Sequence, residues 1–221
     1  IKQLDANSIS LGSRDSLDDE LIIPSTLQVI ESRIIRPGQH KIRVKSRTPA
    51  GLVNAVTNTS SYTNNDGVSG PFVITLTIEE DEKEYVFYIP RFLSLGTSKC
   101  LDNFFNMYSP SAMSEEYMDS LYEDTPCLYV KQDTALELYH LTGKQFYKDF
   151  LKKSKNSIIK RYFDRGQEKE IIDFLQFGFF ASSSLDKFRK IADEREMSVL
   201  SAYILEEQKK KAPKTTTKFT I

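Results

Sequence analysis

Strand patterns and helix patterns occupy opposite ends of this 221-residue chain. Residues 1–92 contain short runs of β-branched and aromatic residues between polar stretches, whereas residues 131–208 carry apolar residues at helical spacing. Strands and helices that are segregated along a chain are typical of α+β proteins. We therefore predict an α+β fold, in which a small antiparallel β-rich N-terminal part is followed by a stack of antiparallel helix pairs.

A β-hairpin is the clearest local prediction. Residues 72–78 and 85–89 are rich in β-branched and aromatic residues and flank an acidic connection, residues 79–84. Side chains alternate between the two faces of a strand, so apolar residues of one run can oppose those of the other. The predicted facing sets are Phe72, Ile74, Leu76 and Ile78 on the first strand and Tyr85, Phe87 and Ile89 on the second.

Four segments are predicted along the chain. Residues 1–92 form the β-rich part, with a long polar loop over residues 50–71 that is rich in Asn, Thr, Ser and Gly. Residues 93–130 form a connection of short helices, one of them capped by Ser114. Residues 131–208 form a helical-repeat domain, and the Lys- and Thr-rich residues 209–221 are predicted to be disordered.

The predicted helices come in pairs of similar length. Gly178 is suited to follow a helix and Ser184 to cap the next one. Ile171-Ile172 and Val199-Leu200 lie 28 residues apart in the second helices of two successive pairs. Short helix pairs at near-constant spacing are the signature of stacked α-repeats. The predicted pairs are residues 134–141 with 144–155, 157–164 with 167–177, and 184–193 with 196–210.

The sequence of these pairs resembles known helical repeats. Arg-Gly-Gln-Glu-Lys-Glu-Ile-Ile-Asp-Phe-Leu at residues 165–175 resembles the inter-helix turn and second helix of an ankyrin-type repeat. Residues 185–206 resemble the closing repeat of a helical module at the C-terminal end of bacterial (Firmicutes-type) leucine-rich-repeat proteins, and residues 21–30 resemble one strand-bearing unit of those proteins. The resemblance implies an ankyrin-like stack that mediates binding rather than chemistry.

Aromatic residues near the edges of the predicted stack are the candidate docking surface for a protein partner. The alternative is that most of these rings form the core between repeats. The residues concerned are Tyr139, Phe146, Tyr147, Phe174 and Phe177.

A basic strand is the sharpest local feature of the sequence. No acidic residue occurs between positions 32 and 65, and alternation places the last four cations on one strand face, about 6.6–7 Å apart. This spacing is similar to that of phosphates along a nucleic-acid strand, which indicates a phosphate or acidic-partner site. The alternative is a solvated strand face that pairs with the acidic residues 79–84. The basic residues are Arg33, Arg36, Lys41, Arg43, Lys45 and Arg47.

Catalytic and cofactor motifs are not apparent. The two His and two Cys residues are too few for the usual zinc-ligand spacings, and the glycines do not form a nucleotide-binding loop. We therefore predict no metal, no cofactor and no catalytic residue. A hydrolase or nuclease acting through scattered acids is a third hypothesis, which requires a concave cluster of acids with raised pKa values.

Composition bounds the setting of the protein. No apolar run approaches the roughly 20 residues that a membrane span needs, so a soluble protein is predicted. The first residue is Ile1, so we expect a processed chain or part of a longer one. Cys100 and Cys127 are expected to be reduced thiols in a cytoplasmic protein, with a single disulfide in an exported protein as the alternative.

The charge distribution leads to the functional prediction. The net charge of -1 hides a difference between residues 1–130, with 11 basic and 18 acidic residues, and residues 131–221, with 19 and 13. Such a chain carries two surfaces of opposite character. We predict a non-enzymatic protein–protein interaction or adaptor module of a larger bacterial or phage assembly, with nucleic-acid binding through residues 33–47 and the following loop as the alternative.

Overall fold

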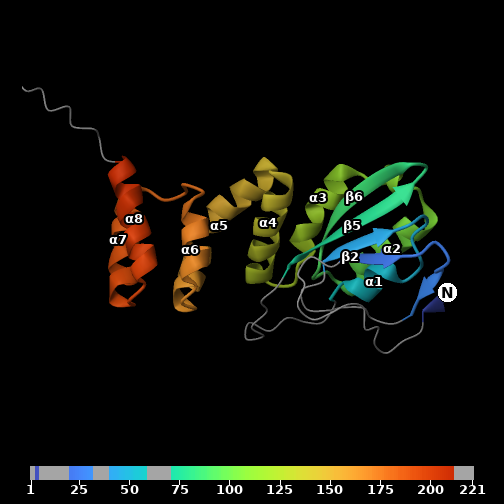
Figure 1. Ribbon diagram of the computed structural model, residues 1–221, viewed down its shortest axis with the longest axis horizontal. Helices are drawn as coiled ribbons and strands as arrows, with labels where there is room; N and C mark the ends of the chain where they lie inside the picture. The colour runs from blue at the N-terminus through green and yellow to red at the C-terminus, as the bar shows by residue number, and fades with distance from the viewer. Residues whose placement is uncertain (1–2, 5–19, 32–39, 59–70, 212–221) are drawn as a thin grey trace, which may run out of the picture. The chain divides into compact units, whose positions relative to one another are not determined.

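The computed structural model describes residues 3–4, 20–31, 40–58 and 71–211 and divides the chain into two compact units, Ile1–Phe150 and Leu151–Ile221 (Figure 1). The α+β class is confirmed: a mixed four-stranded sheet lies in the first unit, and helices form the rest. Among the described residues, no helix combines the length and the apolar character that crossing a bilayer requires.

The main sheet has the strand order β2-β4-β5-β6, with β2 at Glu20–Ile23, β4 at Lys41–Val44, β5 at Val73–Glu80 and β6 at Lys83–Pro90. Strands β2, β4 and β5 run parallel, and only β6 is antiparallel to its neighbour. The prediction of an antiparallel sheet was therefore wrong for two of the three strand pairings. A second small sheet pairs β1 (Gln3–Leu4) with β3 (Val29–Ile30) in parallel.

The parallel pairing of β4 with β5 depends on a crossover connection that contains helix α1 (Leu52–Val56). Four of the five residues of α1 are buried, so the helix packs as part of the core. The predicted polar loop over 50–71 thus begins with a buried helix, while residues 59–70 lie outside the described residues. The helix enters through Gly51, whose φ of 84° and close approach to Ile30 require the absence of a side chain.

The predicted hairpin is confirmed, and its predicted facing sets lie opposite each other. Ile74, Leu76 and Ile78 of β5 lie opposite Ile89, Phe87 and Tyr85 of β6. Its two-residue turn, Asp81-Glu82, has positive φ at both positions, 48° and 61°, which is the geometry of a type I′ turn. The acidic connection is therefore shorter than predicted, because residues 79, 80, 83 and 84 belong to the strands.

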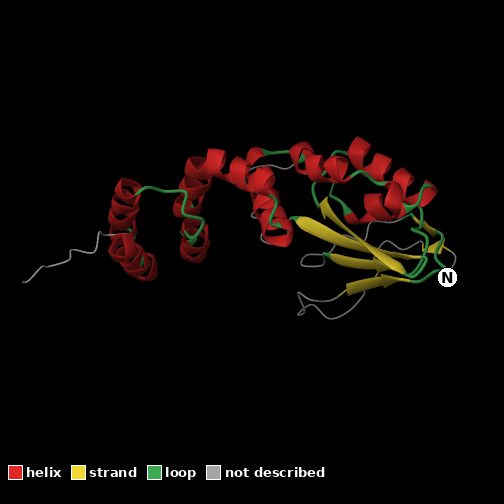
Figure 2. Cartoon of the chain, turned by 90° about the horizontal axis from the view of Figure 1, so that it is seen from above, coloured by secondary structure: helices red, strands yellow, loops and turns green. Residues whose placement is uncertain are grey.

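Helices cover one face of the main sheet (Figure 2). The core beneath them joins strand residues such as Val44, Ile74 and Leu76 to α1 and to Phe105 of α2 (Leu95–Met107). The chain then forms η1 (Pro110–Ala112), α3 (Glu115–Ser120), η2 (Leu121–Asp124) and α4 (Leu128–Thr142). The opposite face carries the alternate strand residues, including the basic side chains of β4.

Helix α5 (Gln145–Asp164) is continuous, whereas the sequence predicts two helices that break near residue 156. No glycine or proline lies between residues 145 and 164, so nothing in the sequence requires that break. The second unit continues with α6 (Glu168–Leu175), α7 (Ser182–Glu194) and α8 (Ser198–Lys211), and residues 212–221 are not described. The cap of α7 is Ala181 rather than the predicted Ser184.

Two turns of the second unit repeat each other at a spacing of 30 residues rather than the 28 read from the sequence. Gln167 N donates to Tyr162 O after α5, and Met197 N donates to Ala192 O after α7. The residue before each donor, Gly166 or Glu196, has positive φ, as the Schellman helix ending requires. The two helix pairs therefore share a turn geometry.

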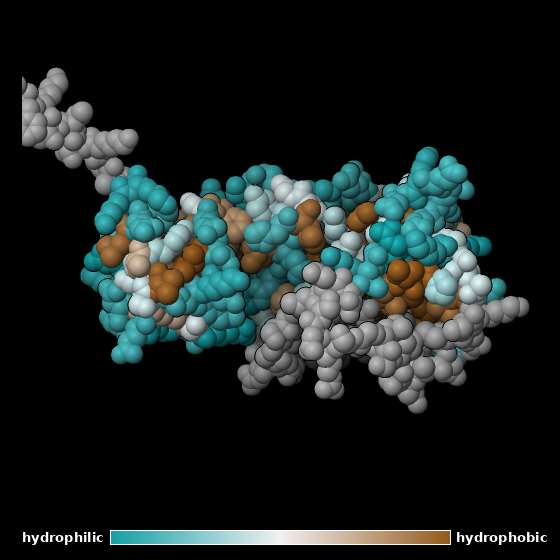
Figure 3. Space-filling view, in the orientation of Figure 1, coloured by the Kyte–Doolittle hydropathy of each residue, from teal (hydrophilic) through white to brown (hydrophobic). Residues whose placement is uncertain are grey.

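Apolar side chains also reach the surface of the second unit. Val199 and Leu205 of α8 are 61% and 39% exposed. In Figure 3, brown hydrophobic patches interrupt the hydrophilic surface over α6 to α8. Single exposed apolar residues are common on protein surfaces, so these residues alone identify no binding site.

Candidate functional site

A pocket of about 350 Å³ lies beside the edge strand β6, between α3, α4 and the start of α5. Its volume falls within the range of small-ligand and peptide side-chain pockets. All of its lining residues belong to the first unit. They are Val86, Phe87, Tyr88, Met113, Glu115, Met118, Asp119, Leu138, Thr142, Lys144 and Tyr147.

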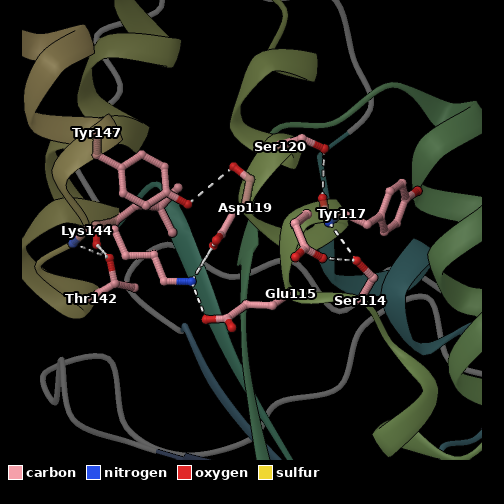
Figure 4. A network of polar contacts seen from close by, with 10 residues as sticks. Ser114, Glu115, Tyr117, Asp119, Ser120, Thr142, Lys144 and Tyr147 are labelled. Carbon is pink, nitrogen blue, oxygen red and sulfur yellow. Dashed lines mark hydrogen bonds and ion pairs between the residues drawn. The ribbon is translucent and has the colours of Figure 1, made fainter.

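The polar side of this pocket is centred on Lys144 (Figure 4). Its ammonium Nζ lies 2.5 Å from Glu115 Oε1 and 2.7 Å from Asp119 Oδ2. Burial alone would lower the pKa of Lys144, but hydrogen bonds to the two carboxylates outweigh it and raise the pKa above its ordinary value. The amine is therefore protonated at neutral pH.

Local sequence signals place these charged groups. Ser114 caps α3 as predicted, because its hydroxyl accepts a hydrogen bond from Tyr117 N at 3.4 Å. Glu115 and Asp119 then lie one helical turn apart on the same side of α3. Gly143, with φ of 68°, ends α4 and turns the chain so that Lys144 enters the pocket.

Tyr147 closes the inner end of the polar side. Its ring is 1% exposed and contacts the ring of Tyr122 edge-on, with centroids 5.3 Å apart. Its hydroxyl lies 3.4 Å from the carbonyl oxygen of Asp119. Burial, with a smaller effect of the Asp119 charge, raises the pKa of Tyr147, so the phenol stays neutral and holds α3 against α5.

The apolar side of the pocket comes from both faces of the sheet edge. Phe87 points toward the helices, where its ring lies 4.8 Å from that of Phe105, and Met113 and Met118 pack against the same core. Val86 and Tyr88 point to the other side of β6 because strand side chains alternate. The pocket therefore wraps around the edge of β6.

The charged side chains of the pocket pair with one another. One lysine faces two acids, so the cluster keeps one negative charge in excess, and the lining contains no Cys, Ser or His. Within the residues that the structure describes, no group of three or more His, Cys, Asp or Glu side chains is arranged to hold a metal ion. Cys100 and Cys127 are free thiols outside the pocket lining.

The basic strand is neutralised by acids on neighbouring strands. Arg43 donates to Glu79 Oε1 at 3.0 Å and to Glu84 Oε1 at 2.6 Å, and its Nε lies 3.2 Å from Glu20. Lys45 Nζ lies 2.9 Å from the same oxygen of Glu79. The hydrogen bonds that Arg43 donates to Glu79, Glu84 and Glu20 raise the pKa of Arg43, which remains a cation.

The predicted row of four cations is not formed. Lys41, Arg43 and Lys45 follow the alternation of β4, but the strand ends at Val44 and Ser46 has a φ of 144°. Arg47 therefore leaves the row and donates to the carbonyl oxygen of Asn106 on α2. Arg33 and Arg36 lie outside the described residues.

The predicted docking aromatics are divided between the units. Tyr147 and Phe174 are each 1% exposed, so neither ring is available to a partner in this structure. Phe146 is 38% exposed, while Tyr139 and Phe177 are half-buried. The structure places none of these five except Tyr147 in the lining of the pocket.

Most pocket residues were not singled out from the sequence. The Ser114 cap was predicted. The ion pairs of Glu115 and Asp119 were not, because their partner Lys144 lies 25 residues beyond Asp119. The predicted helix pair 134–141 and 144–155 also places a break between residues 141 and 144. Those two signals locate the helix ends that carry the polar side, and only the fold brings them together.

Comparison with known proteins gives no relative: no protein-family model, no curated protein and no solved structure matches this chain. The resemblance to helical-repeat modules of leucine-rich-repeat proteins therefore remains a prediction from the sequence.

Proposed function

We propose that this chain is a non-enzymatic protein-interaction module that acts as an adaptor in a larger assembly, and that the pocket beside β6 receives the partner. The observation that carries the proposal is the composition of the pocket. An edge strand and apolar side chains line it, while its lysine and two acids form ion pairs with one another.

The ion pairs of the basic strand favour this proposal over nucleic-acid binding. Arg43 shares its donors among three carboxylates, and Lys45 shares one of them. A phosphate would have to compete with these acids and would meet their negative charge. The helix pairs of the second unit, including an ankyrin-like stacking of them, are proposed as a scaffold for further contacts.

Site-specific photo-crosslinking tests the proposal. A photoreactive phenylalanine analogue at position 86, whose Val side chain is 48% exposed, is expected to give a discrete protein adduct in cells of the source organism. The same analogue at Lys99, which is exposed on α2 away from the pocket, is the control. The adduct must then be identified and must bind the purified chain. Adducts to nucleic acid alone, or identical adducts from both positions, overturn the proposal.

A further inference from the structure

The pairing of β5 with β6 determines which backbone groups point away from the sheet. Glu80 and Lys83 close the two-residue turn as a hydrogen-bonded pair, and hydrogen-bonded pairs then recur at every second position. Phe72 and Arg91 continue this series of hydrogen-bonded pairs, because Arg91 N donates to Phe72 O at 2.8 Å. Thr75 lies between two positions of this series, and its N–H points away from β6 and donates to His40 O on the β4 side.

The residue opposite Thr75 is Tyr88, and the residue opposite Thr77 is Val86. Since Thr75 and Thr77 direct their backbone groups toward β4, the N–H and C=O groups of Tyr88 and Val86 face the outer edge of β6. Pro90 occupies the next outward-facing position. Because that position makes no hydrogen bond to β5, the missing N–H of proline removes no bond between β5 and β6. The edge strand thus presents donors and acceptors at a regular spacing.

These outward groups lie at the pocket. Val86, Phe87 and Tyr88 all line it, and no backbone partner on the outer side of Val86 or Tyr88 is recorded among the described residues. Backbone groups beside an apolar wall need a hydrogen-bonding partner. A second extended chain supplies such partners in register and places its side chains alternately toward the two sides of the strand.

We propose that the partner contributes an extended segment that pairs with Val86 and Tyr88 as a further strand of the sheet. This inference rests on the proposed function and specifies its partner. Side chains on one side of the added strand would lie near Phe87 and Met118, and those on the other near Val86 and Tyr88. β-branched or other apolar residues at alternate positions suit both walls.

The charges of the site specify a basic side chain in that segment. Glu115 and Asp119 face only one lysine in the pocket, and Glu84 lies on β6 itself. The side chain of Glu115 is 77% exposed and that of Glu84 is 58% exposed, so both are accessible to a partner. A Lys or Arg of the segment can share Glu115 with Lys144 at little cost, because an exposed ion pair is weak.

Selection from random octapeptides displayed on phage tests the inference with the full chain as bait. The expected peptides carry alternating apolar residues with Lys or Arg between them. Two variants are matched at one position: Val86→Pro removes the outward N–H without removing a hydrogen bond to β5, whereas Val86→Thr keeps that N–H and the β-branched shape. Selected peptides are expected to bind Val86→Thr as they bind the wild type, and Val86→Pro at least tenfold more weakly.

A chemical control covers the case in which Val86→Pro fails to fold, as judged by circular dichroism. Synthetic copies of a selected peptide are N-methylated at alternate residues along one edge or the other, and only one of the two isomers is expected to bind. Failure to select peptides, helical spacing in those selected, equal binding to both isomers or undiminished binding to Val86→Pro overturns the inference. If a position-86 crosslink still identifies a protein partner, the proposed function survives that failure.

Discussion

Replacing Asp102 by Asn tests how the crossover helix α1 is held against the rest of the first unit. Asp102 lies on α2 and is 8% exposed. Its Oδ2 accepts a hydrogen bond from Gly51 N at 2.7 Å and its Oδ1 accepts one from Val53 N at 2.9 Å. Burial raises the pKa of Asp102, and the two hydrogen bonds oppose the rise. Burial therefore destabilises the ionised carboxylate, while its hydrogen bonds to α1 stabilise it.

The magnitude follows from those two bonds. Asn keeps one acceptor oxygen, but its amide nitrogen is a donor that faces the remaining N–H of α1. A hydrogen bond to a charged group contributes about 1.5–3 kcal/mol, and an unsatisfied buried N–H costs about 1–3 kcal/mol. Relief from burying a charge offsets part of this loss. We therefore expect Asp102→Asn to lower the free energy of unfolding of the first unit by about 2–3 kcal/mol.

Urea unfolding followed by circular dichroism and tyrosine fluorescence measures this change. The neighbouring residue Asn103 is exposed on the same helix, so Asn103→Ala is the matched control and is expected to change the free energy by less than about 0.5 kcal/mol. A value for Asp102→Asn no larger than that of the control refutes the reasoning.

Four further substitutions test other parts of the structure. Glu196 has positive φ, which glycine adopts without strain, so Glu196→Gly should stabilise the second unit by about 0.5–1 kcal/mol. Gly166→Ala at the equivalent turn should destabilise it by about 1 kcal/mol. Thermal unfolding measures both, and a shift of the melting temperature in the same direction for the two variants contradicts the repeated turn. Gly51→Ala should prevent folding of the first unit, because an added Cβ would lie 2.0 Å from Ile30 O. A circular dichroism spectrum of this variant like that of the wild type contradicts the predicted clash. Hydrogen bonds from Lys45 and Arg43 lower the pKa of Glu79 below 4.5 in the folded chain. The ionised side chain therefore stabilises the fold above pH 4.5, and this effect is lost as the pH falls through the folded-state pKa. The difference in urea midpoint between wild type and Glu79→Gln should shrink between pH 6 and pH 3, and a constant difference contradicts this prediction.

The hairpin was predictable because its information is local. Alternating apolar residues in two neighbouring runs fix both strands, and the register follows from the length of the turn. The same holds for the caps at Ser114 and Gly143, where one residue determines where a helix begins or ends.

The parallel order of the sheet was not predictable in this way. It depends on the burial of α1, a five-residue helix whose apolar run was read as part of a polar loop. The same long-range dependence hid the pocket, because Lys144 meets Asp119 only after α4 has returned to β6. Alternation also failed for Arg47, since the strand ends before it and periodicity carries no information past that point.

Hydrogen exchange of the β6 amides tests the central claim, that a partner strand pairs with the outer edge of this strand. In the free chain, the amides of Val86 and Tyr88 should exchange quickly, while those of Tyr85 and Phe87, which bond to β5, should exchange slowly. A saturating selected octapeptide should slow exchange at Val86 and Tyr88 at least tenfold and leave Tyr85 and Phe87 unchanged. Saturation of the chain with no change at Val86 and Tyr88 would contradict the account.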